Sequence, residues 1–84
     1  MKKIPRSITL PFGYHIEVQY LSKEAFIEKN GNCDAAWWAE SEEEEEGGTI
    51  DLIKSVPPKK QWLNFLHELE HSLVDYREFL RSRV

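Results

Sequence analysis

The C-terminal third of the chain contains the longest element that the sequence predicts. From Pro58 to about Arg81, neither Gly nor a further Pro interrupts the chain, and apolar residues recur at intervals of three and four. This spacing gives a helix one apolar face, and Pro is tolerated in the first turn of a helix. We therefore predict a helix over residues 58–81, against which the rest of the chain packs.

Two histidines in this segment are spaced so that they share one face of the helix. His67 and His71 are four residues apart in the pentapeptide H-E-x-x-H, so their imidazoles lie one turn apart and could bind one zinc ion, Zn²⁺. Glu68 points to the side of this pair, where its carboxylate could act as general base on a water that the metal activates. Two ordinary solvated histidines are the alternative.

A helical wheel separates these side chains from the predicted core. With His67 at zero and roughly 100° per residue, His71, Asp75 and Glu78 fall between about 20° and 80°. Six apolar residues fall between about 160° and 240°. These six are Trp62, Phe65, Leu69, Leu73, Tyr76 and Leu80. The wheel thus predicts a helix that packs by one face and carries potential metal ligands on another.

Five shorter elements precede this helix. Strands are indicated by alternating apolar and polar residues, as from Tyr14 to Tyr20. His15 lies on the polar face of this strand, where it is a solvated side chain or, as the less simple alternative, a metal ligand. Ser22 is a suitable helix N-cap, and Asn30-Gly31 is a suitable stop. In chain order we predict a strand over 8–10, a strand over 14–20, a helix over 22–29, a strand over 33–39 and a strand over 49–54.

The last two strands form a predicted hairpin around an acidic loop. Trp37 and Trp38 place one indole on each face of their strand, so one belongs to the core and the other lines a cleft or covers an edge. Residues 42–46 are five consecutive Glu, whose like charges repel one another on a strand. We expect a solvated loop that serves solubility, or that attracts a cation or a basic peptide.

Together these elements predict an α+β fold in a single domain, residues 1–84. A small, mostly antiparallel sheet of three to four strands packs on the long C-terminal helix, which carries the candidate active site. A short helix follows the second strand. A chain of 84 residues can bury only a small core.

Composition narrows the classes of function. The net charge of −4 argues against nucleic acid or an anionic membrane surface as the main partner. The single cysteine, Cys33, excludes an internal disulfide and fits a reducing compartment. No long apolar run follows the N-terminal basic residues, so we expect neither a signal peptide nor a membrane span, and a cytoplasmic protein.

The order of elements and the segment F-L-H-E-L-E-H-S-L-V-D resemble the zincin metallopeptidases, in particular the minimal gluzincin-type domains. The resemblance covers Tyr14 to Tyr76, and the pentapeptide is its specific part. It implies a zinc-dependent peptidase with His67 and His71 as ligands and Glu68 as general base. It also implies that the strand over 49–54 is the edge of the cleft, to which a peptide or protein substrate adds as a further strand.

The sequence departs from this family at the third zinc ligand. Gluzincins take a glutamate from a second helix after the motif, whereas this sequence continues for only thirteen residues after His71. Glu78 is our first candidate as a direct ligand. Asp75 lies about 12 Å along the helix axis from His67, so it is better placed to orient His71, and it is the alternative ligand. A ligand from another chain and an incomplete site also stay open.

Two main functional classes follow, and a third remains. The first is a small zinc-dependent metallopeptidase that uses Glu68 to activate water. The second is a non-catalytic or latent relative that binds a metal or a partner through the same scaffold. The third is a structural or oligomer-forming protein whose acidic loop binds a basic partner. The sequence does not define the oligomeric state or the peptide substrate.

Overall fold

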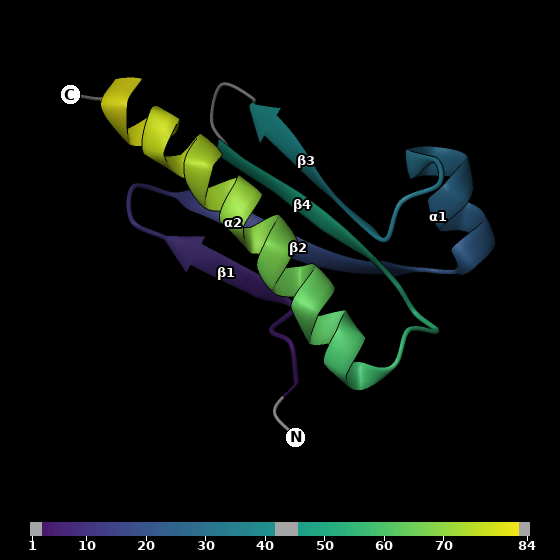
Figure 1. Ribbon diagram of the computed structural model, residues 1–84. Coiled ribbons are helices and arrows are strands. Elements are labelled where there is room, and N and C mark those ends of the chain that lie inside the picture. The colour runs from purple at the N-terminus through teal and green to yellow at the C-terminus, as the bar shows by residue number, and fades with distance from the viewer. Residues whose placement is uncertain (1–2, 42–45, 83–84) are drawn as a thin grey trace.

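The structure, a computed structural model, describes residues 3–41 and 46–82. It is the α+β fold that the sequence predicts, with a four-stranded sheet, a long C-terminal helix and a short helix after the second strand (Figure 1). Residues 42–45 of the predicted acidic loop lie outside the described residues. The elements are β1 (Ser7–Leu10), β2 (Tyr14–Leu21), α1 (Lys23–Asn30), β3 (Ala35–Ser41), β4 (Glu46–Ile53) and α2 (Pro58–Ser82).

The sheet is mixed, with the strand order β1-β2-β4-β3. The pairs β1–β2 and β3–β4 are antiparallel, and β4 lies parallel to β2. The chain leaves β2 through α1, forms β3, and returns along β4 into the space between β2 and β3. The predicted hairpin is thus confirmed, with its first strand, β3, at an edge of the sheet.

One prediction about this sheet is wrong. The strand predicted over 49–54 is not an edge, because β4 pairs along its length with β2 on one side and with β3 on the other. The physical reason lies in its burial, since Ile50, Asp51, Leu52 and Ile53 are all buried. A strand whose two faces are both covered belongs in the middle of a sheet, so the peptide-binding role of an edge strand cannot fall on these residues.

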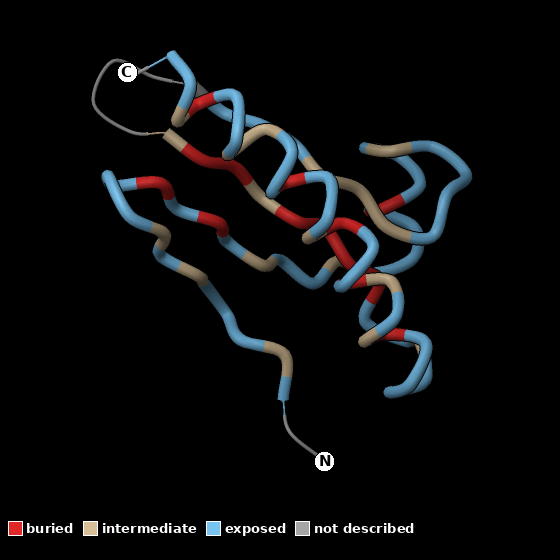
Figure 2. Tube along the Cα trace, turned by 60° about the vertical axis from the view of Figure 1, so that its left-hand side comes forward, coloured by how far each residue is buried: buried red, intermediate tan, exposed pale blue. Residues whose placement is uncertain are grey.

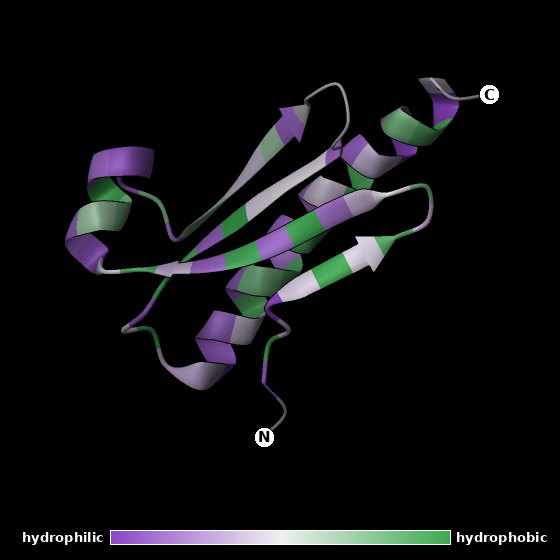
Figure 3. Ribbon diagram, turned by 180° about the vertical axis from the view of Figure 1, so that it is seen from behind, coloured by the Kyte–Doolittle hydropathy of each residue, from purple (hydrophilic) through white to green (hydrophobic). Residues whose placement is uncertain are grey.

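The core lies between the sheet and α2, which crosses one face of it (Figures 1 and 2). On the opposite face, α1 packs near one end of β2 and β4, and Figure 3 shows the rest of that face without a helix over it. The molecule therefore has essentially two layers. Its buried cluster consists of Tyr14, Ile16, Ile50, Leu52, Phe65 and Phe79.

The packed face of α2 differs in part from the predicted one. Phe65 is buried as predicted, but Leu73 is 42 % exposed, and Glu68 and Ser72 are buried in its place. These two residues, together with Phe65, fall between about 100° and 160° on the wheel, so the helix is turned toward the histidine side of the predicted orientation. The other four predicted residues, Trp62, Leu69, Tyr76 and Leu80, still pack against the core. The Ser72 hydroxyl tolerates burial because it donates a 2.6 Å hydrogen bond to the Leu69 carbonyl.

The two tryptophans of β3 divide as predicted. Trp37 packs against the core, whereas Trp38 is half-exposed and donates a hydrogen bond from Nε1 to Asn30 Oδ1. Residues 33–39 thus present one indole to each side of the sheet. In the part of the chain that the structure describes, no helix has both the length and the apolar character needed to cross a bilayer.

Candidate metal centre

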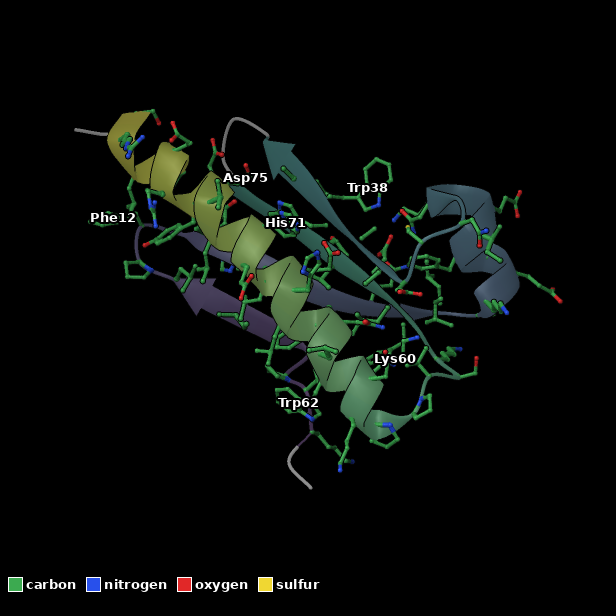
Figure 4. The ribbon with its side chains drawn as sticks, viewed as in Figure 1. Phe12, Trp38, Lys60, Trp62, His71 and Asp75 are labelled. Carbon is green, nitrogen blue, oxygen red and sulfur yellow. The ribbon has the colours of Figure 1, made fainter. Side chains whose placement is uncertain are left out.

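His67 and His71 lie side by side on the exposed surface of α2. Their Nε2 atoms are 3.3 Å apart, and the ring centroids are 4.8 Å apart. Figure 4 shows His71 on the side of α2 that faces β3, with Asp75 one turn further along the same side. The helix therefore directs both imidazoles toward one point beside the edge of the sheet.

The distance between the two Nε2 atoms fits a shared metal ion. Zinc–nitrogen bonds of about 2.0–2.1 Å, at a tetrahedral angle, separate two nitrogen ligands by about 3.3–3.4 Å. The observed 3.3 Å equals this value without any change of rotamer. The same distance also suits an N–H···N hydrogen bond between two neutral rings, which is the arrangement expected of the pair without a metal.

Glu68 is the unusual member of the group. Its side chain is only 8 % exposed, and no hydrogen bond or ion pair to its carboxylate is found among the described residues. Its carboxylate oxygens are not among the buried atoms without a partner, so they keep some contact with solvent. Candidate ligand atoms of His67, Glu68 and His71 all lie within 4.8 Å of one another, so a cation held by the histidines would also lie close to this carboxylate.

A cavity of about 500 Å³ opens next to this group. It lies between α2 and the chain that enters β3, and both His67 and Glu68 border it. Its other lining residues are Cys33, Asp34, Ala35, Leu63 and Asn64. The candidate metal group thus faces a space that is bounded by an edge strand of the sheet and is large enough for part of a peptide.

Asp75 has a different partner from the one that the sequence suggested. Its Oδ2 atom accepts a 2.6 Å hydrogen bond from Trp37 Nε1, which ties α2 to β3. The carboxylate is one turn beyond His71, and the structure gives no hydrogen bond between the two. A role for Asp75 in orienting His71 therefore stays a prediction.

Glu78 lies apart from the histidine pair. Its Oε1 atom pairs with Arg81 Nη1 at 2.8 Å, and it borders a separate cavity with Tyr14 and Glu46. The group that could hold a metal among the described residues contains His67, Glu68 and His71 and not Glu78. The role of Glu78 as third zinc ligand stays a prediction, and this geometry does not favour it.

His15 is also remote from the site. Its strand neighbours Tyr14 and Ile16 pack toward α2, so His15 points to the opposite face of the sheet. There its Nδ1 atom forms a 3.2 Å hydrogen bond with Thr9. The solvated alternative is the one that the structure supports.

Sequence reasoning did not find the residues just before β3 that lie near His67. Cys33 and Asp34 border the same cavity as His67 and Glu68, although more than thirty positions separate them along the chain. The only local signal was a thiol and a carboxylate at the start of a predicted strand. Their approach to α2 depends on the position of β3 at the sheet edge, which short-range patterns do not specify.

Comparisons with models of protein families, with curated proteins and with solved structures find no match to this chain. The class of site is therefore defined by its own residues: a candidate metal centre of two histidines and a buried glutamate on one helix, compatible with an H-E-x-x-H motif.

Proposed function

We propose that this protein is a zinc-dependent hydrolase of peptide bonds, similar in its chemistry to the zincin metallopeptidases. One observation carries the proposal. Two histidine Nε2 atoms stand at the separation of ligands to one tetrahedral ion, beside a buried glutamate that has no other partner among the described residues. The lone cysteine is compatible with the cytoplasmic location that we also propose.

In this proposal His67 and His71 hold the ion, and Glu68 moves the proton. Bound zinc would supply Lewis acidity, which lowers the pKa of water and polarises a carbonyl group. The Glu68 carboxylate accepts the proton of the attacking water and then donates it to the leaving amine.

The substrate that we propose is an extended peptide along β3. Within the described chain, β3 pairs with β4 on one side only, so its outer edge can take another strand. The start of β3 also borders the cavity in front of Glu68. The net charge of −4 gives no support to a nucleic acid partner.

The test compares Glu68→Gln with the matched control Glu70→Gln, in which the substituted residue is exposed on the same helix. We expect Glu68→Gln to keep about one equivalent of zinc and to lose at least about a hundredfold in hydrolysis of a fluorogenic peptide library. The control should retain both properties. Equal hydrolysis by the two variants would refute the role of Glu68.

A non-catalytic metal-binding protein is the second candidate, and one distance favours it. Because the candidate ligand atoms of all three residues lie within 4.8 Å of one another, Glu68 could itself bind the metal. In that case Glu68→Gln should lower the zinc content, measured by elemental analysis, rather than spare it. The same variant therefore separates the two candidates.

A further inference from the structure

We propose that Cys33 provides the third metal ligand of the His67–His71 site, as a thiolate. This inference deepens the proposed function and rests on it, because it completes the same metal centre. Catalytic zinc sites in proteins use three protein ligands and leave a fourth position open. His67 and His71 fill two positions, and the remaining ligand has to come from a side chain that reaches the same space.

The cavity in front of the histidines contains such a side chain. Cys33 borders it together with His67 and Glu68, and it is the only cysteine of the chain. Glu68, a residue that is more than nine-tenths buried and has no hydrogen-bond or ion-pair partner among the described residues, also borders this cavity, and its unpartnered carboxylate is an independent sign that a cation belongs here. Thiolate sulfur and imidazole nitrogen together are a ligand set that zinc prefers.

Cys33 can move toward the histidines at little cost. Its Sγ atom makes one weak contact, 3.7 Å from the Asn30 carbonyl, and its backbone N–H donates a 3.1 Å hydrogen bond to the Gly31 carbonyl. The thiol is not yet within the 4.8 Å group of ligand atoms. The β3–β4 ladder begins at Ala35, so Cys33 lies outside it. Zinc binding would draw the segment 32–34 toward α2, with no ladder hydrogen bond broken and the thiol proton released to solvent.

The acidic residues near the site are less suitable than Cys33 as the third metal ligand. Ala35 and Trp37 face α2, since Ala35 packs against the core and Trp37 bonds to Asp75, whereas Trp38 bonds to Asn30 on the α1 side. Cys33 and Asp34 lie in the bend that precedes β3, and both border the cavity; of the two side chains, the thiolate is the softer ligand that zinc takes beside imidazole. Asp75 is already engaged by Trp37, and Glu78 by Arg81.

The first experiment is a titration of the reduced, metal-free chain with cobalt chloride. We expect one equivalent of Co²⁺ to produce a near-ultraviolet thiolate-to-cobalt charge-transfer band. Cys33→Ser should lose this band and bind zinc at least tenfold more weakly, while Asp34→Asn, at the neighbouring position in the same cavity, should keep the band and bind within about threefold of wild type.

The second experiment uses only the wild-type chain and the His67→Ala variant. Zinc should slow alkylation of Cys33 by iodoacetamide at least tenfold in the wild type and leave the rate unchanged in His67→Ala. Stoichiometric metal with no charge-transfer band, or an alkylation rate that zinc does not alter, would overturn the Cys33 ligand and leave the proposed function intact. Absence of metal binding in the wild type would overturn both.

Discussion

Tyr14 packs its phenol ring against two other aromatic rings of the core. The side chain is 3 % exposed, and its ring lies 5.0 Å from that of Tyr76 and 5.1 Å from that of Phe79. Burial, followed by the negative charges of Asp75 and Glu46, raises the pKa of Tyr14 to about 12 from its ordinary value of 10.0. Each of these influences disfavours the phenolate, so the folded protein holds the proton more strongly than the unfolded chain.

This pKa shift predicts a loss of stability in alkaline solution. Below about pH 10 both the folded and the unfolded protein keep the phenol proton, so the stability that depends on Tyr14 is fully present. Between about pH 10 and 12 only the unfolded chain releases this proton. The free energy of unfolding should therefore fall by about 2 kcal/mol across this window on account of Tyr14. Urea denaturation of wild type and Tyr14→Phe, followed from about pH 8 to about pH 12, measures the difference.

Tyr20→Phe is the matched control, because Tyr20 lies on the same strand but is 37 % exposed. It should keep the alkaline decline of the wild type. If Tyr14→Phe declined as steeply as the control, burial of Tyr14 would not explain the pH dependence.

At the scale of elements, an ion pair between Lys29 and Asp51 anchors α1 to the sheet. Lys29 Nζ lies 2.8 Å from Asp51 Oδ2, and the side chains of Lys29 and Asp51 are 42 % and 0 % exposed. Asn30 Nδ2 donates a further hydrogen bond to the same oxygen at 3.2 Å, while Asp51 Oδ1 has no hydrogen-bond partner in the described part of the chain. The carboxylate thus depends on the end of α1 for its compensation.

Lys29→Met should destabilise the protein by about 2–3 kcal/mol, because a fully buried carboxylate loses its counter-ion. This lies below the cost for a wholly buried pair, since Lys29 is half-exposed and partly screened by water. The double variant Lys29→Met/Asp51→Asn should recover part of the loss, as measured by urea denaturation in a double-mutant cycle. Lys23→Met, an exposed change on α1, should cost less than about 0.5 kcal/mol, and an equal loss in both lysine variants would contradict the anchor.

Local patterns were sufficient for the elements of this fold but not for their arrangement. Ser22 accepts a hydrogen bond from Ala25 N and Gly31 has a φ of 80°, so the predicted start and stop of α1 are confirmed. The position of β4 between β2 and β3 arises from a parallel pairing across the α1 crossover. Such pairing depends on residues far apart in sequence, so alternation alone could not place the strand.

In the candidate site, too, some features follow from local sequence and others depend on tertiary contacts. His67 and His71 meet because helix geometry fixes residues four apart, and this was readable from the sequence. The rotation of α2 that buries Glu68 and exposes Leu73 depends on which residues fit the sheet, Phe79 among them. The approach of Cys33 to the site depends on tertiary contacts and was not readable.

At the scale of the whole molecule, the domain is thin in one dimension. The principal extents are 41 × 30 × 17 Å, as expected for one helix layer on one sheet layer. An 84-residue chain in this form buries a small core and has only marginal stability of its own. A ligand that binds the folded state alone should therefore have a large relative effect.

Zinc is expected to raise the melting temperature of the whole domain. At a free concentration about 100 times the Kd, binding to the folded state contributes about 2.7 kcal/mol. For a domain of this size each kcal/mol shifts the Tm by about 4–8 °C, so the Tm should rise by roughly 10–20 °C. Thermal unfolding followed by circular dichroism, with zinc chloride and then with EDTA, measures this shift and its reversal.

His67→Ala/His71→Ala should melt at the same temperature under both conditions, because both substitutions lie on the exposed face of α2 and remove the metal ligands. A zinc-dependent rise in that variant would mean that the metal stabilises the fold from a site other than the histidine pair.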